Sequence, residues 1–368
     1  MRFISPALKR LLFPALSRSG YLRYAAGVGP AVVTYHGVLP DGYVMRNDAL
    51  DGHLVHASSL REQLRLLKSR YHVLSPDDFL RWSAGELSLP PRSILLTCDD
   101  ALRNTLTEML PILLEMGVSC LFFATGASAD AAPSMLWYEE LYLMLLDARG
   151  PVSLSILEAD ICMDSIRQNQ IPSHWWNLVQ QFSRFDRTVR RKFLDQIRDQ
   201  LALPSDWAAA VGTNSTTARR FLTLDRDELR RLAAAGMGIG SQSLSHPVLA
   251  RVSDDLAWLE ISESKRVLEE ALEQTVWAFG YPFGNSATVT ERELHLAERA
   301  GFRCAFMNVG GGLGAKNSRF ALPRVHVTAD MTLSEFEAHI SGFYRALRQR
   351  LMGHNEMDAL LNKGEQLS

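Results

Sequence analysis

Short apolar segments alternate with longer amphipathic segments along most of the chain from Ala31 onward. Runs of about four to eight apolar or β-branched residues predict buried strands, and apolar residues at helical spacing predict the helices between them. This alternation is typical of a parallel sheet built from strand–helix–strand units. The expected strands are Ala31–Tyr35, Ile94–Thr97, Cys120–Ala124, Met237–Ser241, Val276–Tyr281, Cys304–Met307 and Arg324–Val327. Seven short strands favour a small α/β barrel over an open sheet.

Polar residues mark the starts of several of the expected helices. Asp225, Ser253 and Thr332 each stand directly before an apolar helical pattern, and Glu335 follows Thr332 at the spacing of a capping box. Such side chains accept hydrogen bonds from the free backbone N–H groups of the first helical turn. The helices between the strands are therefore well marked.

One stretch interrupts the alternation and predicts a separate unit. From Trp137 to about Arg220 the chain has helical periodicity, a Trp175–Trp176 pair and a basic run beginning at Arg187, but no clear strand. We expect a helical insertion at about residues 137–220, on one rim of the barrel. The predicted organisation is a basic amphipathic segment over residues 1–25, the barrel with its insertion over residues 26–351, and a polar tail over residues 352–368.

The first 24 residues are basic and amphipathic. They contain no acidic residue, and five basic residues stand among leucine and phenylalanine side chains: Arg2, Lys9, Arg10, Arg18 and Arg23. Because basic residues recur through the segment and no uninterrupted apolar core follows them, the segment is not a signal peptide. Two interpretations stay open. Residues 1–24 form either a cationic helix on an anionic membrane surface or a helix that packs against its own domain.

Composition places the chain among ordinary globular proteins. Hydrophobic residues make up 47%, charged residues make up 22%, and the formal net charge is −2. Because this balance lacks the basic footprint of a nucleic-acid-binding protein, no nucleic acid partner is expected. The 4 cysteines are widely spaced and form no Cys-x-x-Cys pair, which indicates reduced thiols. We therefore expect a cytoplasmic protein, peripheral on the inner face of the membrane if the first interpretation of residues 1–24 holds.

Three polar clusters stand at the expected carboxyl ends of strands: Thr34–Gly37, Thr97–Asp100 and Gly240–Pro247. Barrel enzymes place their catalytic groups at these ends. Each cluster also has an ordinary structural interpretation, because paired aspartates often cap helices and a single histidine is often part of a core. Two carboxylates after a buried strand nevertheless need a compensating cation or hydrogen bonds, since burial of a charge is costly.

Five segments carry a family resemblance through their order along the chain. They are Thr34-Tyr35-His36-Gly37-Val38, Leu96-Thr97-Cys98-Asp99-Asp100, Gly240-Ser241-Gln242-Ser243-Leu244-Ser245-His246-Pro247, Phe279-Gly280-Tyr281-Pro282-Phe283-Gly284 and Leu322-Pro323-Arg324-Val325. With them the chain resembles the polysaccharide deacetylases of carbohydrate esterase family 4, in the branch of exopolysaccharide and poly-N-acetylglucosamine deacetylases. The resemblance covers roughly residues 31–343 apart from the insertion. It implies a distorted (β/α)7-type barrel.

The resemblance implies a metal centre formed by Asp100, His246 and Gln242. In this family one Asp and two His hold a divalent ion, expected here to be zinc, with open positions at which a water is acidified and an amide carbonyl is polarised. Asp100 and His246 match two of these ligands. Gln242 stands where the family usually has the other His, and its carbonyl oxygen is a poorer zinc ligand than an imidazole.

The resemblance also assigns roles beside the metal. Asp99 matches the carboxylate that takes a proton from the water, and His36 matches the general acid that protonates the leaving amine. The backbone N–H of Phe283 matches an oxyanion donor. Gly280 stands where the wider family often has an Arg that contacts the catalytic Asp. Arg324 is the candidate for that guanidinium, and the alternative is an Arg that only ties the last strand to the barrel rim.

The expected function is that of a metal-dependent hydrolase acting on an amino-sugar glycan. It would remove N-acetyl groups, with N-formyl groups as the second choice, from a polysaccharide or a lipid-linked glycan precursor. Gln242 supports a rival from another class, a catalytically impaired barrel that acts as a carbohydrate-binding module. A glycosidase based on Asp99 and Asp100 is disfavoured, because neighbouring carboxylates on one loop do not readily flank a glycosidic bond at a separation of about 5 Å or more.

Overall fold

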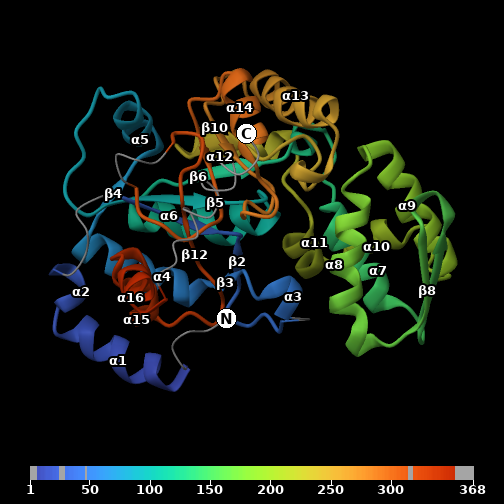
Figure 1. Cartoon of the computed structure of the whole chain (residues 1–368), viewed down its shortest axis with the longest axis horizontal. Helices are drawn as coiled ribbons and strands as arrows, with labels where there is room; N and C mark the ends of the chain where they lie inside the picture. The colour runs from blue at the N-terminus through green and yellow to red at the C-terminus, as the bar shows by residue number, and fades with distance from the viewer. Residues whose placement is uncertain (1–5, 25–29, 46–47, 314–317, 353–368) are drawn as a thin grey trace.

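The computed structural model describes residues 6–24, 30–45, 48–313 and 318–352 (Figure 1). Its main sheet contains parallel strands in the order β11-β10-β9-β6-β5-β1-β12. These strands are β1 (Ala31–Tyr35), β5 (Ser93–Cys98), β6 (Leu121–Ala124), β9 (Gly238–Ser241), β10 (Ala278–Gly280), β11 (Cys304–Phe306) and β12 (Val325–His326). All seven strands expected from the sequence are present, and the prediction of a distorted α/β barrel is confirmed.

The two ends of this sheet approach each other through the segment before β12. Leu322 forms a parallel bridge with Phe306 of β11, and the Met307 N–H donates to the Leu322 carbonyl at 2.8 Å. The same segment continues into β12, where Val325 pairs with Val33 of β1. The sheet therefore curls round on itself instead of staying open.

Successive side chains of each strand face opposite sides of the sheet, as the pleat requires. In β5, Leu95 belongs to the cluster that fills the barrel together with Phe123 of β6. Leu96 belongs to the cluster that packs under the surrounding helices. Continued along the chain, the same alternation places Thr97 and Asp99 on the inner side, so that Asp99 stands at the carboxyl mouth of the barrel.

Helices surround the barrel, and their caps agree with the sequence. Asp225, Ser253 and Thr332 each accept a hydrogen bond from the backbone N–H three residues later. The helices are α4 (Ala57–Arg70), α5 (Pro76–Ser83), α6 (Leu110–Met116), α12 (Arg226–Ala234), α13 (Asp254–Leu272), α14 (Glu291–Arg299), α15 (Leu333–Ile340) and α16 (Phe343–Met352), with the short α2 (Tyr21–Tyr24) and α3 (Asp48–Asp51).

Three short strands were not expected from the sequence. They are β2 (Val38–Leu39), β3 (Val55–His56) and β4 (His72–Leu74). β2 and β3 pair with each other, and β4 pairs with the first half of β5. Strands of two or three residues are too short to produce a periodic pattern, which explains why they were missed.

The insertion forms a unit with its own apolar core at one side of the barrel (Figure 1). Its helices are α7 (Trp137–Asp147), α8 (Ile171–Phe182), α9 (Arg187–Gln200), α10 (Trp207–Thr213) and α11 (Ser215–Phe221). The expectation that it contains no strand was wrong, because β7 (Val152–Ile156) and β8 (Ile161–Ile166) form an antiparallel hairpin. The signal was present in β7, where apolar residues are buried and the serines between them are exposed, the two-residue period of a half-buried strand.

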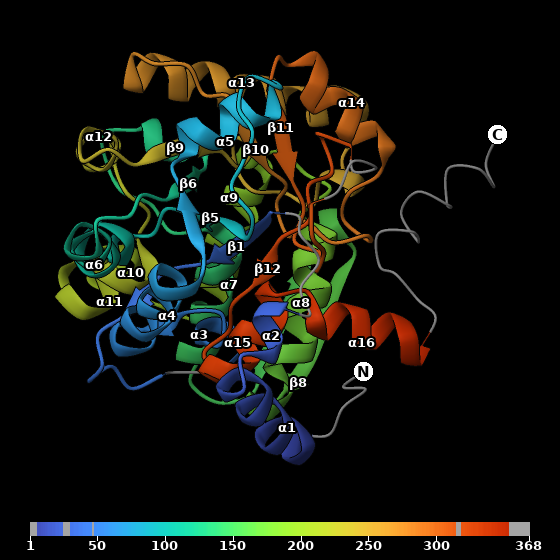
Figure 2. The same ribbon diagram turned by 90° about the vertical axis from the view of Figure 1, so that its left-hand side faces the viewer.

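Helix α1 (Pro6–Arg18) lies against α15 and α16 (Figure 2). The Phe13 side chain is fully buried, with its ring centroid 6.4 Å from that of Phe343 and 6.2 Å from that of Tyr344. Leu12 and Leu16 are partly buried in the same cluster, whereas Leu11 is 75% exposed. Part of the apolar surface of residues 1–24 is thus used inside the molecule.

The burial of Phe13 favours the second interpretation, a helix that packs against its own domain, and contact of residues 1–24 with a membrane stays a prediction. Residues 1–5 and 25–29 lie outside the described ranges. So do residues 353–368 of the expected polar tail. Among the helices that the structure describes, none combines the length and apolar character needed to cross a membrane.

Removing the Phe13 ring tests the packing of α1. We expect Phe13→Ala to lower the free energy of unfolding by about 3 kcal/mol, the range typical of a deleted buried ring. Leu11→Ala, on the exposed side of the same helix, should change it by no more than about 0.5 kcal/mol. Thermal unfolding of the two variants beside the parent chain measures the difference, and equal effects would contradict the packing described.

Candidate active site

The carboxyl ends of neighbouring strands bring the expected polar residues together at one end of the barrel. His36 follows β1, Asp99 and Asp100 follow β5, and Gln242 and His246 lie just beyond β9. Both aspartates, Gln242 and His246 are each only 2% exposed. Since parallel strands end at the same edge of a sheet, residues that are up to about 200 positions apart in sequence become neighbours here.

Asp99 is held by a buried guanidinium. Arg324, which directly precedes β12, donates from Nη1 to Asp99 Oδ1 at 2.6 Å and from Nη2 to Asp99 Oδ2 at 2.7 Å. Its Nε atom donates to the Met307 carbonyl at 3.1 Å, and its guanidinium lies 5.3 Å from the Phe123 ring centroid. Burial is the largest single effect and raises the pKa of Asp99, but the charge and hydrogen bonds of Arg324 together with the neighbouring histidines leave that pKa below its usual value. Asp99 is therefore ionised.

Asp100 has a different environment. Its Oδ1 lies 3.5 Å from Nε2 of His246, and its backbone N–H donates to Gln242 Oε1 at 2.9 Å. Burial, together with the charges of Asp99 and Glu139, raises the pKa of Asp100 well above its usual value, although a hydrogen bond with the Gln242 side chain acts in the opposite direction. A buried carboxylate in this position favours a proton or a bound cation.

Three histidines lie together on the Asp99 side of the site. The His36 ring centroid is 4.7 Å from that of His326 and 5.2 Å from that of His53. His36 Nε2 lies 3.7 Å from Asp99 Oδ2. Burial, and next the neighbouring His326, lower the pKa of His36 to about 3, so the imidazole is neutral at neutral pH.

Sequence reasoning missed His53 and His326. A signal existed for His326, because it stands two residues after Arg324, and the two-residue period of a strand turns both side chains to the same face. No comparable signal marks His53, which is brought in by the loop between α3 and β3.

The insertion supplies an aromatic wall on the Asp100 side. The Tyr138 ring of α7 lies 5.1 Å from the His246 ring and 5.4 Å from the Phe283 ring, measured between centroids. The His246 and Phe283 rings are 4.9 Å apart. Trp137 donates from Nε1 to the His246 carbonyl at 2.9 Å. The insertion is thus part of the site, which the sequence did not indicate.

Backbone strain is concentrated at the mouth of the barrel. Among the described residues other than glycine, ten have positive φ, and five of those line this site: Asp100 (71°), Ala101 (45°), Ser243 (63°), His246 (56°) and Phe283 (59°). L-residues rarely adopt this left-handed conformation, and it persists where the surrounding structure enforces it, often at functional sites. No described residue accepts a hydrogen bond from the Phe283 N–H, so this donor is available.

Asp100 and His246 offer two converging donors for a divalent cation. Burial lowers the pKa of His246 to about 4 and keeps its imidazole neutral, and its Nδ1 atom has no partner among the described residues. Gln242 Oε1 accepts the Asp100 N–H at 2.9 Å, and the second lone pair of this oxygen could still face a cation. Within the described ranges no three His, Cys, Asp or Glu side chains are grouped to hold a metal. Asp100 and His246 thus fit a divalent cation, and Gln242 as its third ligand stays a prediction.

Comparison with solved structures shows which fold this is. The chain is similar to the Streptococcus pyogenes deacetylase PplD in complex with acetate, at 16% identity and a TM-score of 0.54, covering 85% of this chain and 98% of that one. It is also similar to IcaB from Ammonifex degensii, at 16% identity and a TM-score of 0.53, covering 86% and 98%. A de-N-acetylase from Aggregatibacter actinomycetemcomitans gives 14% identity and a TM-score of 0.53, covering 84% and 99%. These likenesses establish a shared fold.

Sequence comparison adds a family and one relative. The family model described as Polysaccharide deacetylase matches residues 164–305, which include Gln242, His246 and Phe283. The chain is 26% identical over 117 residues to the Bacillus subtilis protein YxkH, which is named after the polysaccharide deacetylases. That alignment spans 32% of this chain and only 41% of the relative. The chain is thus similar to the polysaccharide deacetylase family over residues 164–305, and it shares the fold of solved deacetylases.

Proposed function

We propose that this chain is a hydrolase that removes N-acetyl groups from amino sugars of a polysaccharide or a lipid-linked glycan precursor. The observation that carries the proposal is the contrast between two adjacent buried carboxylates. Asp99 is paired with Arg324 and ionised, whereas Asp100 faces His246 and lacks an equivalent cation. One carboxylate is thus suited to accept a proton and the other to bind a cation, which is the division of roles that amide hydrolysis at a metal requires.

Asp99 acts as the base for the attacking water. Because Arg324 keeps the pKa of Asp99 low, this carboxylate is a weak base and removes a proton efficiently only from a water that is already acidified. A divalent cation, expected to be zinc, held by Asp100 and His246 would supply that acidification and polarise the amide carbonyl. Arg324 fixes both Asp99 oxygens, so the orientation of the base is set before substrate arrives.

The remaining groups act on the developing charge and on the leaving amine. The Phe283 N–H is a fixed dipole, which stabilises an oxyanion without reorganisation. His36 lies 3.7 Å from Asp99, close to the proton that Asp99 removes. Since His36 is neutral at neutral pH, we assign it the transfer of that proton to the leaving amine, not the permanent charge of an imidazolium.

A second function, a carbohydrate-binding barrel without catalysis, is favoured by Gln242 alone. Gln242 stands where the family usually has a metal-binding His, and its side-chain oxygen accepts a hydrogen bond from the Asp100 N–H. The complete Asp99–Arg324 pair argues for the enzyme, because a barrel that only binds sugar has no need of an oriented, ionised carboxylate beside a cation site.

The proposed cellular location of the protein is the cytoplasm. Cys98, Cys120 and Cys304 are buried free thiols, and Cys162 is an exposed one. These unpaired thiols support a reducing compartment, the cytoplasm. The substrate assigned there is a glycan precursor made inside the cell.

Substitution of the two aspartates tests their separate roles. Asp99→Asn should reduce acetate release at least about 100-fold, because the base is lost, and should leave zinc binding unchanged. Asp100→Ala should abolish both zinc binding and acetate release. Metal titration of each purified variant beside a deacetylation assay measures the two properties. Equal loss of zinc from both variants would refute the assignment.

The ion pair itself is tested by a rescue experiment. Arg324→Gln leaves the Asp99 carboxylate buried without its partner and should cost about 3–5 kcal/mol of stability. Adding Asp99→Asn removes the unpaired charge, so the double variant should be more stable than Arg324→Gln alone. Thermal unfolding midpoints of the single and double variants give the comparison. A double variant no more stable than the single one would mean that the two side chains are not coupled.

Replacing Gln242 separates the enzyme from the binding barrel. Gln242→His supplies an imidazole, a better zinc ligand than an amide oxygen, and should tighten zinc binding and raise acetate release. Isothermal titration with zinc and the deacetylation assay provide the two measurements. If zinc binds more tightly but no acetate is released, the other groups do not form a working site and the binding barrel is favoured.

A further inference from the structure

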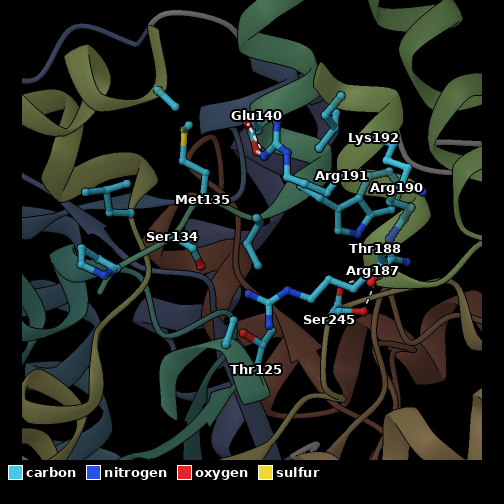
Figure 3. Close-up of a pocket in the computed structure, with 17 residues that line it drawn as sticks. Thr125, Ser134, Met135, Glu140, Arg187, Thr188, Arg190, Arg191, Lys192 and Ser245 are labelled. Carbon is cyan, nitrogen blue, oxygen red and sulfur yellow. Dashed lines mark hydrogen bonds and ion pairs between the residues drawn. The ribbon is translucent and has the colours of Figure 1, made fainter. Parts of the chain in front are cut away.

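A cavity lies beside the candidate active site, between the barrel and the insertion. Its volume is about 620 Å³, within the range of small-molecule sites. The start of α7, the first turns of α9 and the segments after β6 and β9 form its walls. Figure 3 shows four basic side chains from one helix around it: Arg187, Arg190, Arg191 and Lys192. The family match and the proposed catalytic groups leave this cavity without a role.

Arg190 is the central feature of this cavity. Its side chain is only 2% exposed, and its Nη2 atom donates to the Ser245 carbonyl at 3.2 Å and to the Ser245 hydroxyl. Its Nε and Nη1 atoms have no hydrogen-bond partner among the described residues. Burial lowers the pKa of Arg190 to about 10, so the guanidinium still carries its charge at neutral pH. Buried, charged N–H groups without partners are costly unless a ligand accepts their hydrogen bonds.

The charges around Arg190 leave the cavity basic. Arg191 is neutralised by Glu140, with both carboxylate oxygens 2.9 Å from its Nη1 atom, and Arg187 pairs with Asp130 at 3.3 Å. The nearest carboxylate oxygen to Arg190 belongs to Glu260, at 4.0 Å. Lys192 has no ion pair within the described part of the chain. The unpaired positive charge therefore belongs to Lys192, whereas Arg190 forms a long ion pair with the buried Glu260.

A hydroxyl adds a further donor. Thr125 lines the same cavity, and its Oγ1 atom is buried without a partner among the described residues. Two guanidinium N–H groups, an ammonium and a hydroxyl exceed what the two oxygens of a carboxylate need. They suit the three terminal oxygens of a phosphate group, which accept charge-assisted hydrogen bonds from guanidinium and ammonium groups.

The cavity shares a wall with the candidate active site. Ser245, which Arg190 contacts, directly precedes His246, and Trp137 lines the cavity while donating to the His246 carbonyl at 2.9 Å. The Arg190 guanidinium also lies 5.0 Å from the Trp137 ring centroid. The cavity therefore lies next to the candidate active site, with Trp137 and the Ser245–His246 segment between them.

We infer that this cavity binds a phosphate group carried by the amino-sugar substrate. The inference rests on the proposed function, because it places the phosphate on the molecule that the site deacetylates. It narrows the substrate class to phosphorylated amino sugars, either free sugar phosphates or sugars joined to a lipid through phosphate.

Calorimetric titration of the full chain tests this directly, with N-acetylglucosamine 1-phosphate compared with N-acetylglucosamine. The phosphate form should bind at least about tenfold more tightly, the effect of one or two charged hydrogen bonds. Arg190→Gln and the exposed-site variant Lys192→Gln should each reduce this preference. Arg198→Gln, on the same helix but outside the cavity, should leave it intact. Because Lys192 is exposed, its variant keeps the test valid if Arg190→Gln fails to fold.

Titrations with two further ligands identify the molecule that carries the phosphate. Tighter binding of a lipid-linked sugar phosphate in detergent micelles would assign the lipid-linked form, and equal binding would assign the free sugar phosphate. Inorganic phosphate that binds as tightly as the sugar phosphate would overturn the inference that the anion belongs to the sugar.

Affinity and acetate release, measured together, distinguish failure of the phosphate site from failure of the proposed deacetylase function. Equal affinity for the neutral and phosphorylated sugars would overturn the inference even if acetate is released from both. A phosphate preference that depends on Arg190 and Lys192, without acetate release from any sugar, would support the cavity as a phosphate site and overturn the deacetylase.

Discussion

The ion pair between Arg324 and Asp99 connects the closure of the barrel to its chemistry. Arg324 lies in the segment that pairs with β11 and leads into β12. Asp99 directly follows β5, and its side chain points to the inner side of the barrel. Both side chains are buried, so each depends on the other for compensation of its charge. The same contact that ties the last strand to the sheet therefore also keeps Asp99 ionised and fixes its two oxygens.

Ionisation of Asp99 determines what its neighbour can do. Asp100 is buried beside that negative charge and beside Glu139, and its backbone is held in a left-handed conformation by the Gln242 contact. Two adjacent carboxylates cannot both stay charged at this depth unless a cation joins them. Arg324 serves one carboxylate, and the pair formed by Asp100 and His246 is where we propose that a second cation binds. Gln242 then acts by holding Asp100 in position.

The sequence predicted the barrel well because its evidence is local. Each buried strand is a short apolar run, and each polar cluster follows such a run. The hairpin formed by β7 and β8 was overlooked although its alternation is visible. The sequence could not predict that Tyr138 and His53 lie in the site or that Phe13 is buried, since all three depend on contacts between segments distant in sequence. The partner of Gln242 was equally hidden, because an amide oxygen binds a metal or a backbone N–H with the same chemistry.

The most direct test of this account is acetate release from N-acetylglucosamine oligosaccharides, measured with zinc present, after chelation, and after zinc is restored. The account predicts one free amine for each acetate released, loss of the reaction on chelation and its recovery with zinc. Binding of the oligosaccharides without acetate release, under every metal condition, would contradict the assignment of Asp99 as a base and leave the barrel a carbohydrate-binding protein.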